Sequence, residues 1–151
     1  MADNLILAEI QEAVKTAMRE RNKEASTTLR MAISEFKKEE IDKKIEITDF
    51  LIVAILHKMI KQRKDAASQF TDANRQELAD KEIREIDILS VYLPEQMKES
   101  DIVANIAQEI ALLGASSMQD MGKVMGVLKS KLQGKADMSV VSKKVKELLN
   151  T

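Results

Sequence analysis

The stretch "VYLPEQMKES", residues 91–100, decides how this chain is divided. It contains Pro94, the only proline among 151 residues. The residue before a proline disfavours helical geometry, so a helix that arrives from the N-terminal side has to stop there. The polar residues 95–99 are typical of a short linker. The sequence therefore predicts two domains, residues 1–94 and residues 95–151.

Composition predicts that both domains are helical. The chain has four glycines and lacks the Asn-Gly and Asp-Gly pairs that mark β-hairpins. Hydrophobic residues make up 44% and charged residues 32%, which is typical of a globular protein. Apolar residues recur with the 3.6-residue period of amphipathic helices. We expect an all-α fold, with four helices before Pro94 and three after it.

Caps and breaks set the expected helix ends. In the first domain we expect helices from Asp3 to Glu20, from a cap at Ser26 or Thr27 to Asp42, from a cap at Thr48 or Asp49 past Lys64, and from near Asp72 to Pro94. In the second we expect helices from Ser100 to Gly114, from a Ser117–Asp120 capping box to Gly134, and from a cap at Ser139. The run Phe50–Leu56 is apolar on nearly all sides, so we expect it to be the buried centre of the first domain.

The residues argue against a self-sufficient enzyme. There is no cysteine, and His57 is the only histidine, so neither a thiolate or multi-histidine metal site nor a His-based triad is expected. No cofactor and no metal are predicted. The longest apolar run, Phe50–Leu56, is too short to cross a bilayer, and no secretory signal begins the sequence. We expect a cytoplasmic protein without a membrane partner.

The stretch "DMGKVMG", residues 120–126, contains two glycines inside a predicted helix. At 100° per residue, the apolar residues of this helix form a core stripe. Gly122, Gly126 and Ser130 form a separate strip beside it, which we call the glycine strip, and Lys123 and Lys129 flank it. Small residues permit close approach to the backbone. Two interpretations remain open: a partner helix docks on the strip, or a nucleic-acid backbone does.

Charge favours an anionic partner for the second domain. The chain has a net charge of −1, but residues 114–151 contain seven lysines against three acids, a net charge of +4. These lysines are Lys123, Lys129, Lys131, Lys135, Lys143, Lys144 and Lys146. All three Phe and the one Tyr precede Pro94, so stacking on single-stranded bases is not expected. Recognition of a folded RNA by its shape and phosphates fits better.

A second basic segment, "KMIKQRKD", spans residues 58–65. We call Lys58, Lys61, Arg63 and Lys64 the secondary basic face. Cations near a helix C-terminus are favoured by the helix dipole, so this face is explained as solvated surface. A phosphate-binding face is the alternative.

Several motifs in order resemble one family. They are Leu29-Arg30, "KMIKQRKD" at 58–65, "NRQELADKE" at 74–82, "YLP" at 92–94 and "DMGKVMG" at 120–126. Together they resemble the YqeY, or GatB/YqeY-like, family over nearly the whole chain. The resemblance implies an all-helical fold whose C-terminal part is similar to the tail domain of the tRNA-dependent amidotransferase B subunit.

That tail contacts tRNA, so the resemblance implies tRNA as a partner, together with amidotransferase or aminoacyl-tRNA machinery. Descriptions of the family also mention carbon–nitrogen ligase activity with glutamine as amido-nitrogen donor. The ATP-using and metal-using part of the B subunit has no counterpart in this sequence, and we find no residues for that chemistry. The expected role is therefore binding of tRNA by the C-terminal domain.

Overall fold

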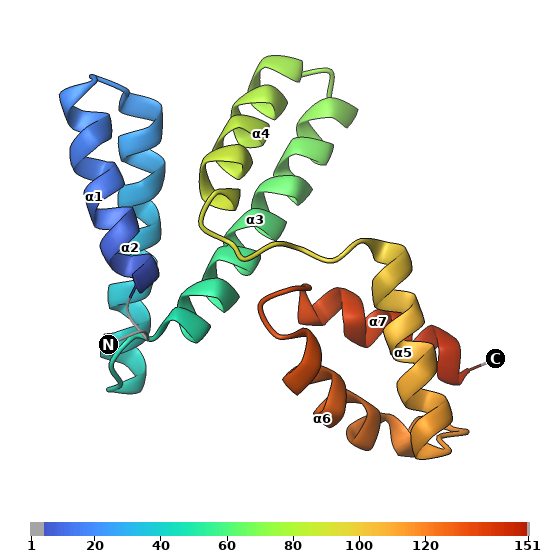
Figure 1. Ribbon diagram of the computed structural model, residues 1–151. Coiled ribbons are helices and arrows are strands. Elements are labelled where there is room, and N and C mark those ends of the chain that lie inside the picture. The colour runs from blue at the N-terminus through green and yellow to red at the C-terminus, as the bar shows by residue number, and fades with distance from the viewer. Residues whose placement is uncertain (1–4, 151) are drawn as a thin grey trace. The chain divides into compact units, whose positions relative to one another are not determined.

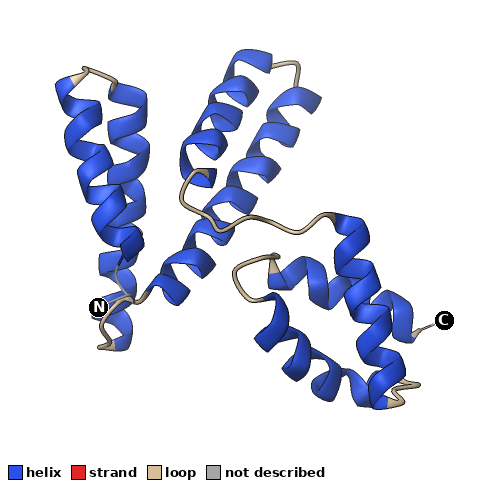
Figure 2. Cartoon of the chain, viewed as in Figure 1, coloured by secondary structure: helices blue, strands red, loops and turns tan. Residues whose placement is uncertain are grey.

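The computed structural model describes residues 5–150, and this range is helical apart from short connections (Figure 1, Figure 2). It contains no β-strand, only an isolated bridge between Gln133 and Ala136. The predicted all-α class is thus confirmed. The helices are α1 (Leu5–Arg19), α2 (Lys23–Lys43), α3 (Asp49–Asp72), α4 (Gln76–Ser90), α5 (Glu99–Leu113), α6 (Met121–Leu132) and α7 (Met138–Leu149).

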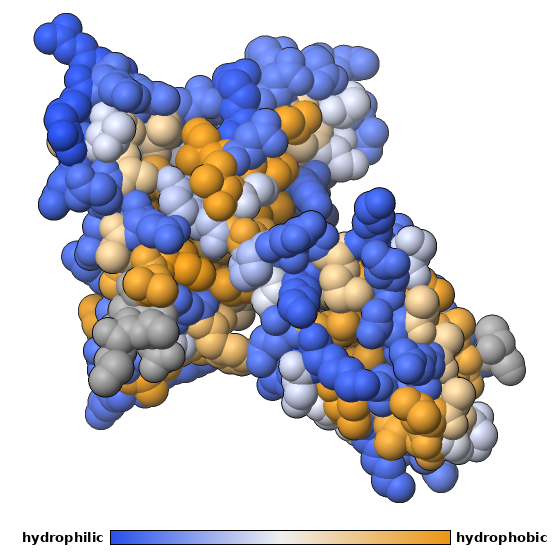
Figure 3. Space-filling view, viewed as in Figure 1, coloured by the Kyte–Doolittle hydropathy of each residue, from blue (hydrophilic) through white to orange (hydrophobic). Residues whose placement is uncertain are grey.

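Contacts within the chain divide it into two compact units, Met1–Leu93 and Pro94–Thr151, which we call the first and the second unit. In the first unit, α1 with α2 and α3 with α4 form two helical hairpins (Figure 1). Their inner faces share one core that includes Phe36, Leu56 and Leu89. Apolar side chains are also visible on the surface between the two hairpins (Figure 3).

Two helices of the first unit, α2 and α3, begin at a side chain that accepts a backbone N–H. The Thr48 hydroxyl accepts the Leu51 N–H at 3.3 Å and begins α3, as predicted. The prediction for α2 was wrong, because Asn22 begins this helix by accepting the Ala25 N–H at 3.1 Å. Ser26 lies inside the helix instead, where its hydroxyl donates to the Lys23 carbonyl.

Two other expectations for the first unit need correction. Phe50 is 48% exposed, so the run Phe50–Leu56 faces the core on one side only. The start predicted near Asp72 is instead the end of α3. The chain turns at Asn74, whose φ of 59° is in the left-handed region, and α4 begins at Gln76. The expected start at Asp3 lies outside the described residues.

Tyr92 follows α4 and packs, half-buried, against the core of the first unit. Burial raises the pKa of its hydroxyl, and the charge of Glu9 raises it further. The only tyrosine of the chain is therefore part of the packing of the first unit.

In the second unit, α5, α6 and α7 all contact one another. Their core includes Ile106, Val124, Leu128, Val141 and Val145, all with no exposed surface. Each helix thus contributes a single apolar stripe to a shared centre.

The ends of these helices match the predictions in part. Gly114 ends α5 with a φ of 64°, a left-handed conformation that suits glycine, as predicted. The capping box of Ser117 and Asp120 is also present, in a short 3₁₀ turn before α6. The cap of α7 was predicted wrongly: Asp137 accepts the Ser139 N–H at 3.0 Å and begins this helix. The Ser139 hydroxyl donates to the same Asp137 oxygen at 2.9 Å.

The segment between Pro94 and α5 is hydrogen-bonded to the loop between α6 and α7. The Met97 N–H donates to the Lys135 carbonyl at 2.8 Å. The Gln96 side-chain amide donates to the Gly134 carbonyl at 2.8 Å. The residues predicted as a linker are therefore attached to the second unit at Gln96 and Met97.

The core of the second unit predicts a large effect of truncation at Leu128. Leu128→Ala is expected to lower the free energy of unfolding of this unit by about 2–5 kcal/mol, because the deletion leaves a cavity beneath α6. The matched control is Leu112→Ala on α5, where the leucine is 69% exposed and a change within about 0.5 kcal/mol is expected. Amide hydrogen exchange in α5, α6 and α7 measures both. Equal effects of the two variants would contradict the described packing.

Candidate nucleic-acid interface

The buried stripe of α6 orients the rest of the helix. Val124, Leu128 and Leu132 are at most 2% exposed. These residues are four apart and lie on one side of a helix with 3.6 residues per turn. The opposite side of α6 therefore faces away from the core of the second unit.

The glycine strip occupies this outward side. Gly122, Gly126 and Ser130 are all exposed. An added Cβ would meet nothing within 4 Å at either glycine. Close packing within the structure therefore does not explain the glycines. Because they have no side chain, the α6 backbone along the strip is accessible to a partner.

Two lysines lie beside the strip, as predicted. Lys123 and Lys129 are exposed and lie on opposite sides of Gly126, about 60° from it around the helix axis. Neither forms an ion pair with a residue in the described range 5–150. Along the axis they are about 9 Å apart, at 1.5 Å per residue. Both ammonium groups are available to an anionic partner that lies on the strip.

Two other predicted lysines are already engaged. Lys131 forms an ion pair with Glu109 of α5, whose side chain is only 5% exposed. Lys144 donates to Glu99 at the start of α5 at 2.5 Å and holds the pKa of that carboxyl below its ordinary value. Since Lys131 neutralises a buried carboxylate, its first role is structural. These two lysines join α5 to α6 and α7.

The remaining three are exposed. Lys143 and Lys146 lie on α7, away from its buried residues Val141 and Val145, and Lys135 precedes α7 in the loop. None of the three forms an ion pair with any of residues 5–150. Their charge adds to that of Lys123 and Lys129 on the second unit.

A negative charge marks the N-terminal end of α6. The Asp120 carboxylate accepts the Ser116 N–H at 3.0 Å and the Ser117 N–H at 3.4 Å. These two hydrogen bonds lower the pKa of Asp120 below its ordinary value of 3.8, and the nearby Lys123 adds to this effect. Any anion bound to α6 is therefore expected along the strip and not at this helix end.

The secondary basic face does not exist as predicted. Lys58, Lys61 and Lys64 are exposed on α3, but Arg63 is only 8% exposed. The Arg63 guanidinium points inward, where Nε donates to Glu85 of α4 at 3.2 Å. The expectation for Arg63 was wrong because this position continues the inner stripe of α3 through Leu56 and Met59.

Sequence reasoning missed the partner of Arg63. Glu85 is four residues before the buried Leu89, so it occupies a core position of α4. Two opposite charges on the inner stripes of neighbouring helices were a signal of a buried ion pair. That signal is visible in the sequence once α3 and α4 are known to pack together.

The described residues form neither a metal-ligand cluster nor a membrane-spanning helix. No three His, Cys, Asp or Glu side chains of residues 5–150 come together as metal ligands would. No described helix combines the length and apolar character needed to cross a bilayer. His57 is half-buried on α3.

Comparison with known proteins assigns the family. A family model described as "Yqey-like protein" matches residues 7–149. The chain belongs to the YqeY-like family. The family predicted from the motifs is thus confirmed.

Curated fungal relatives are similar over long stretches. The chain is 31% identical over 150 residues to "Altered inheritance of mitochondria protein 41, mitochondrial" of Pyrenophora tritici-repentis, covering 97% of this chain and 82% of the relative. It is 33% identical over 106 residues to the protein of the same name in Kluyveromyces lactis, covering 68% and 57%. An uncharacterized protein of Schizosaccharomyces pombe is 36% identical over 88 residues, covering 58% and 72%. These names state a mitochondrial place for two of the relatives and no activity.

The open surroundings of Gly126 predict that Gly126→Ala stabilises the second unit. Alanine is favoured over glycine inside a helix by about 1 kcal/mol, and no neighbour obstructs the added methyl group. The matched control is Gly114→Ala, which is expected to destabilise the unit because alanine is strained at a φ of 64°. Hydrogen exchange of the α6 amides measures both variants. A destabilising Gly126→Ala would mean that the strip is packed against something in the free protein.

The lowered pKa of Asp120 predicts a dependence on pH. Its pKa is lower in the folded chain than in the unfolded chain, so the carboxylate stabilises the fold above the ordinary value of 3.8. This contribution is lost as the pH falls through the folded pKa. Asp120→Asn is therefore expected to destabilise the second unit at about pH 7 and to differ less from the original protein at about pH 3. Exchange of the α6 amides measures the stability of both proteins. If Asp120→Asn lowers the stability equally at both pH values, the ionised Asp120 carboxylate is not the cause.

Proposed function

We propose that the second unit binds folded RNA, in the first place tRNA, along the glycine strip of α6. The observation that carries the proposal is the open strip between Lys123 and Lys129, two exposed lysines without an ion pair in the described range. Glycines bring the helix backbone close to a rigid partner, and the lysines meet its phosphates. In this proposal Lys135, Lys143 and Lys146 add phosphate contacts. Lys131 and Lys144 are already paired with Glu109 and Glu99, so they make the weaker contribution to phosphate binding.

The choice of tRNA rests on the resemblance of residues 95–151 to the tail of an amidotransferase B subunit. It extends the proposal to an association with the amidotransferase or aminoacyl-tRNA machinery. The proposal includes binding and no catalytic step by this chain. The proposed binding requires a compartment in which tRNA is aminoacylated. The predicted cytoplasm is one such compartment, and the mitochondrion named for the fungal relatives is another.

The lack of aromatic residues after Pro94 supports a folded partner over a single strand. Single-stranded nucleic acids are held largely by base stacking on aromatic side chains. Lysines bind phosphates as point charges, whatever the base sequence. The proposal therefore predicts affinity that depends strongly on salt and weakly on sequence.

Salt titration with the lysine variants tests the proposal. If about four phosphates are contacted, log K for a tRNA transcript is expected to fall with log salt at a slope of about −3 to −4. Lys123→Gln with Lys129→Gln is expected to reduce the slope by about 2, because two phosphate contacts are lost. Binding is followed by fluorescence anisotropy at several salt concentrations.

The control makes the same charge change elsewhere. Lys58→Gln with Lys61→Gln removes two exposed lysines from α3 and is expected to leave affinity and slope unchanged. The proposal fails if the original protein does not bind tRNA at low salt. It also fails if the α6 pair and the α3 pair of variants behave alike. A normal RNA affinity of Gly126→Leu, together with loss of a protein partner, would favour the docking of a helix on the strip.

A further inference from the structure

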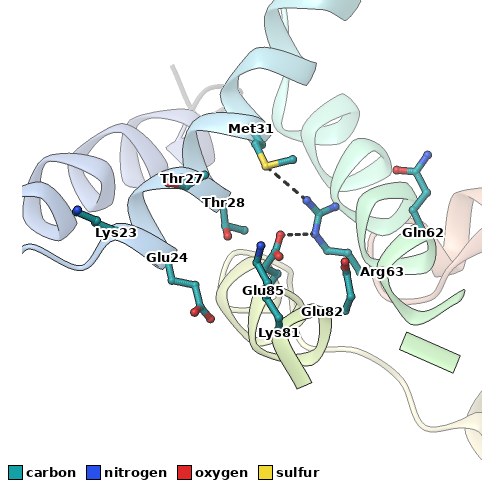
Figure 4. A pocket seen from close by; sticks show the side chains of 10 residues that line it. All are labelled: Lys23, Glu24, Thr27, Thr28, Met31, Gln62, Arg63, Lys81, Glu82 and Glu85. Atoms are coloured by element: carbon teal, nitrogen blue, oxygen red, sulfur yellow. Dashed lines mark hydrogen bonds and ion pairs between the residues drawn. The ribbon is translucent and has the colours of Figure 1, made fainter. Parts of the chain in front are cut away.

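A pocket opens in the first unit where α2, α3 and α4 meet (Figure 4). Its volume is about 600 Å³, within the range of sites that bind small molecules. Apart from Met31, every residue that lines it has a polar or charged side chain, and two of the charged side chains are about nine-tenths buried. The pocket belongs to the first unit, so it is separate from the proposed RNA interface.

The buried cation of this pocket has unused donor capacity. Arg63 Nε donates to Glu85 at 3.2 Å, and Nη1 donates to the Met59 carbonyl at 3.2 Å. Among the described residues, the acceptor for Nη2 is the sulfur of Met31 at 3.9 Å, which is a weak one (Figure 4). A buried guanidinium N–H without an oxygen acceptor is costly. An oxygen atom of a bound molecule would satisfy it.

A second donor faces the same space. Thr28 on α2 lines the pocket and is only 2% exposed. Its hydroxyl has no hydrogen-bond partner among residues 5–150, whereas the nearby Ser26 hydroxyl donates to the Lys23 carbonyl at 3.2 Å. In Figure 4 the Thr28 side chain points from α2 toward Glu85 and Arg63. Two donors from two helices thus lack a good acceptor in one pocket.

The charged residues that line the pocket balance one another: Lys23, Arg63 and Lys81 against Glu24, Glu82 and Glu85. Two of the three carboxylates already have a cationic partner, because Glu85 is paired with Arg63 and Glu24 is paired with Arg84 at 2.8 Å. Arg84 lies outside the lining, and with it counted the group has a net charge of +1. The charge of the surroundings is therefore compatible with an oxyanion, and the selection for one comes from the free donors.

We propose that this pocket binds a small molecule through an oxyanion, either a carboxylate or a phosphate. One oxygen accepts from Arg63 Nη2 in place of the Met31 sulfur, and Thr28 Oγ1 donates to the same group. Lys81 adds an ammonium group at the mouth. Glu85 remains on the Nε side of Arg63, so the guanidinium lies between two anions and is preorganised by the first of them.

Amide NMR spectra of the full chain test this proposal. The protein is titrated with inorganic phosphate, with succinate and with sodium chloride at matched ionic strength. Saturable shifts of the Thr28, Arg63 and Lys81 amides are expected with phosphate or succinate and not with chloride. The arm that saturates at the lower concentration identifies the class of oxyanion.

Variants of the lining residues show whether the amide chemical-shift changes come from binding in the pocket. Thr28→Val keeps the branched shape but removes the hydroxyl, and Lys81→Gln removes the charge at the mouth. Each is expected to raise Kd about tenfold, the effect of losing one hydrogen bond or ion pair to a charged group. Lys58→Gln, an exposed lysine of α3 outside the pocket, is the control and is expected to leave Kd unchanged.

The proposal is overturned if neither phosphate nor succinate produces shifts beyond those of chloride. It is also overturned if Lys81→Gln binds as the original protein does. Because Lys81 is exposed, this variant retains the fold and decides the question even if Thr28→Val does not fold.

Discussion

The second unit depends on one contact, the burial of the α6 stripe of Val124, Leu128 and Leu132 among α5 and α7. A twelve-residue helix that buries one stripe leaves its opposite side to solvent. The glycine strip lies on that side, so the same packing that stabilises the unit also exposes the strip. Burial of this stripe therefore offsets the cost of the two helix-weakening glycines, which lie outside the core.

The features that could be predicted from the sequence are those that depend on the hydrophobic period or on a strong capping residue. The all-α class, the stripe of α6, and the roles of Thr48 and Gly114 were all readable from local pattern. Where two acceptors compete, local pattern does not decide. Asn22 and Asp137, and not the serines that follow them, begin α2 and α7 because their side-chain oxygens are placed to accept the first free N–H groups.

The candidate sites could be predicted only in part, because some of their residues depend on a second helix. Lys123 and Lys129 were placed correctly because exposure follows from the period of one helix. The burial of Arg63 depends on a second helix that supplies Glu85, and the engagement of Lys131 depends on Glu109. Charges that are buried must be paired, so their roles follow from the tertiary partner.

The position of Tyr92 has a consequence for experiments in solution. The chain has no tryptophan, and its one tyrosine and three phenylalanines all lie in the first unit. Intrinsic fluorescence and near-ultraviolet circular dichroism therefore report the melting of the first unit alone, while far-ultraviolet signals sum the helices of both. A transition seen only in the far ultraviolet belongs to the second unit, which allows the two stabilities to be separated without labels.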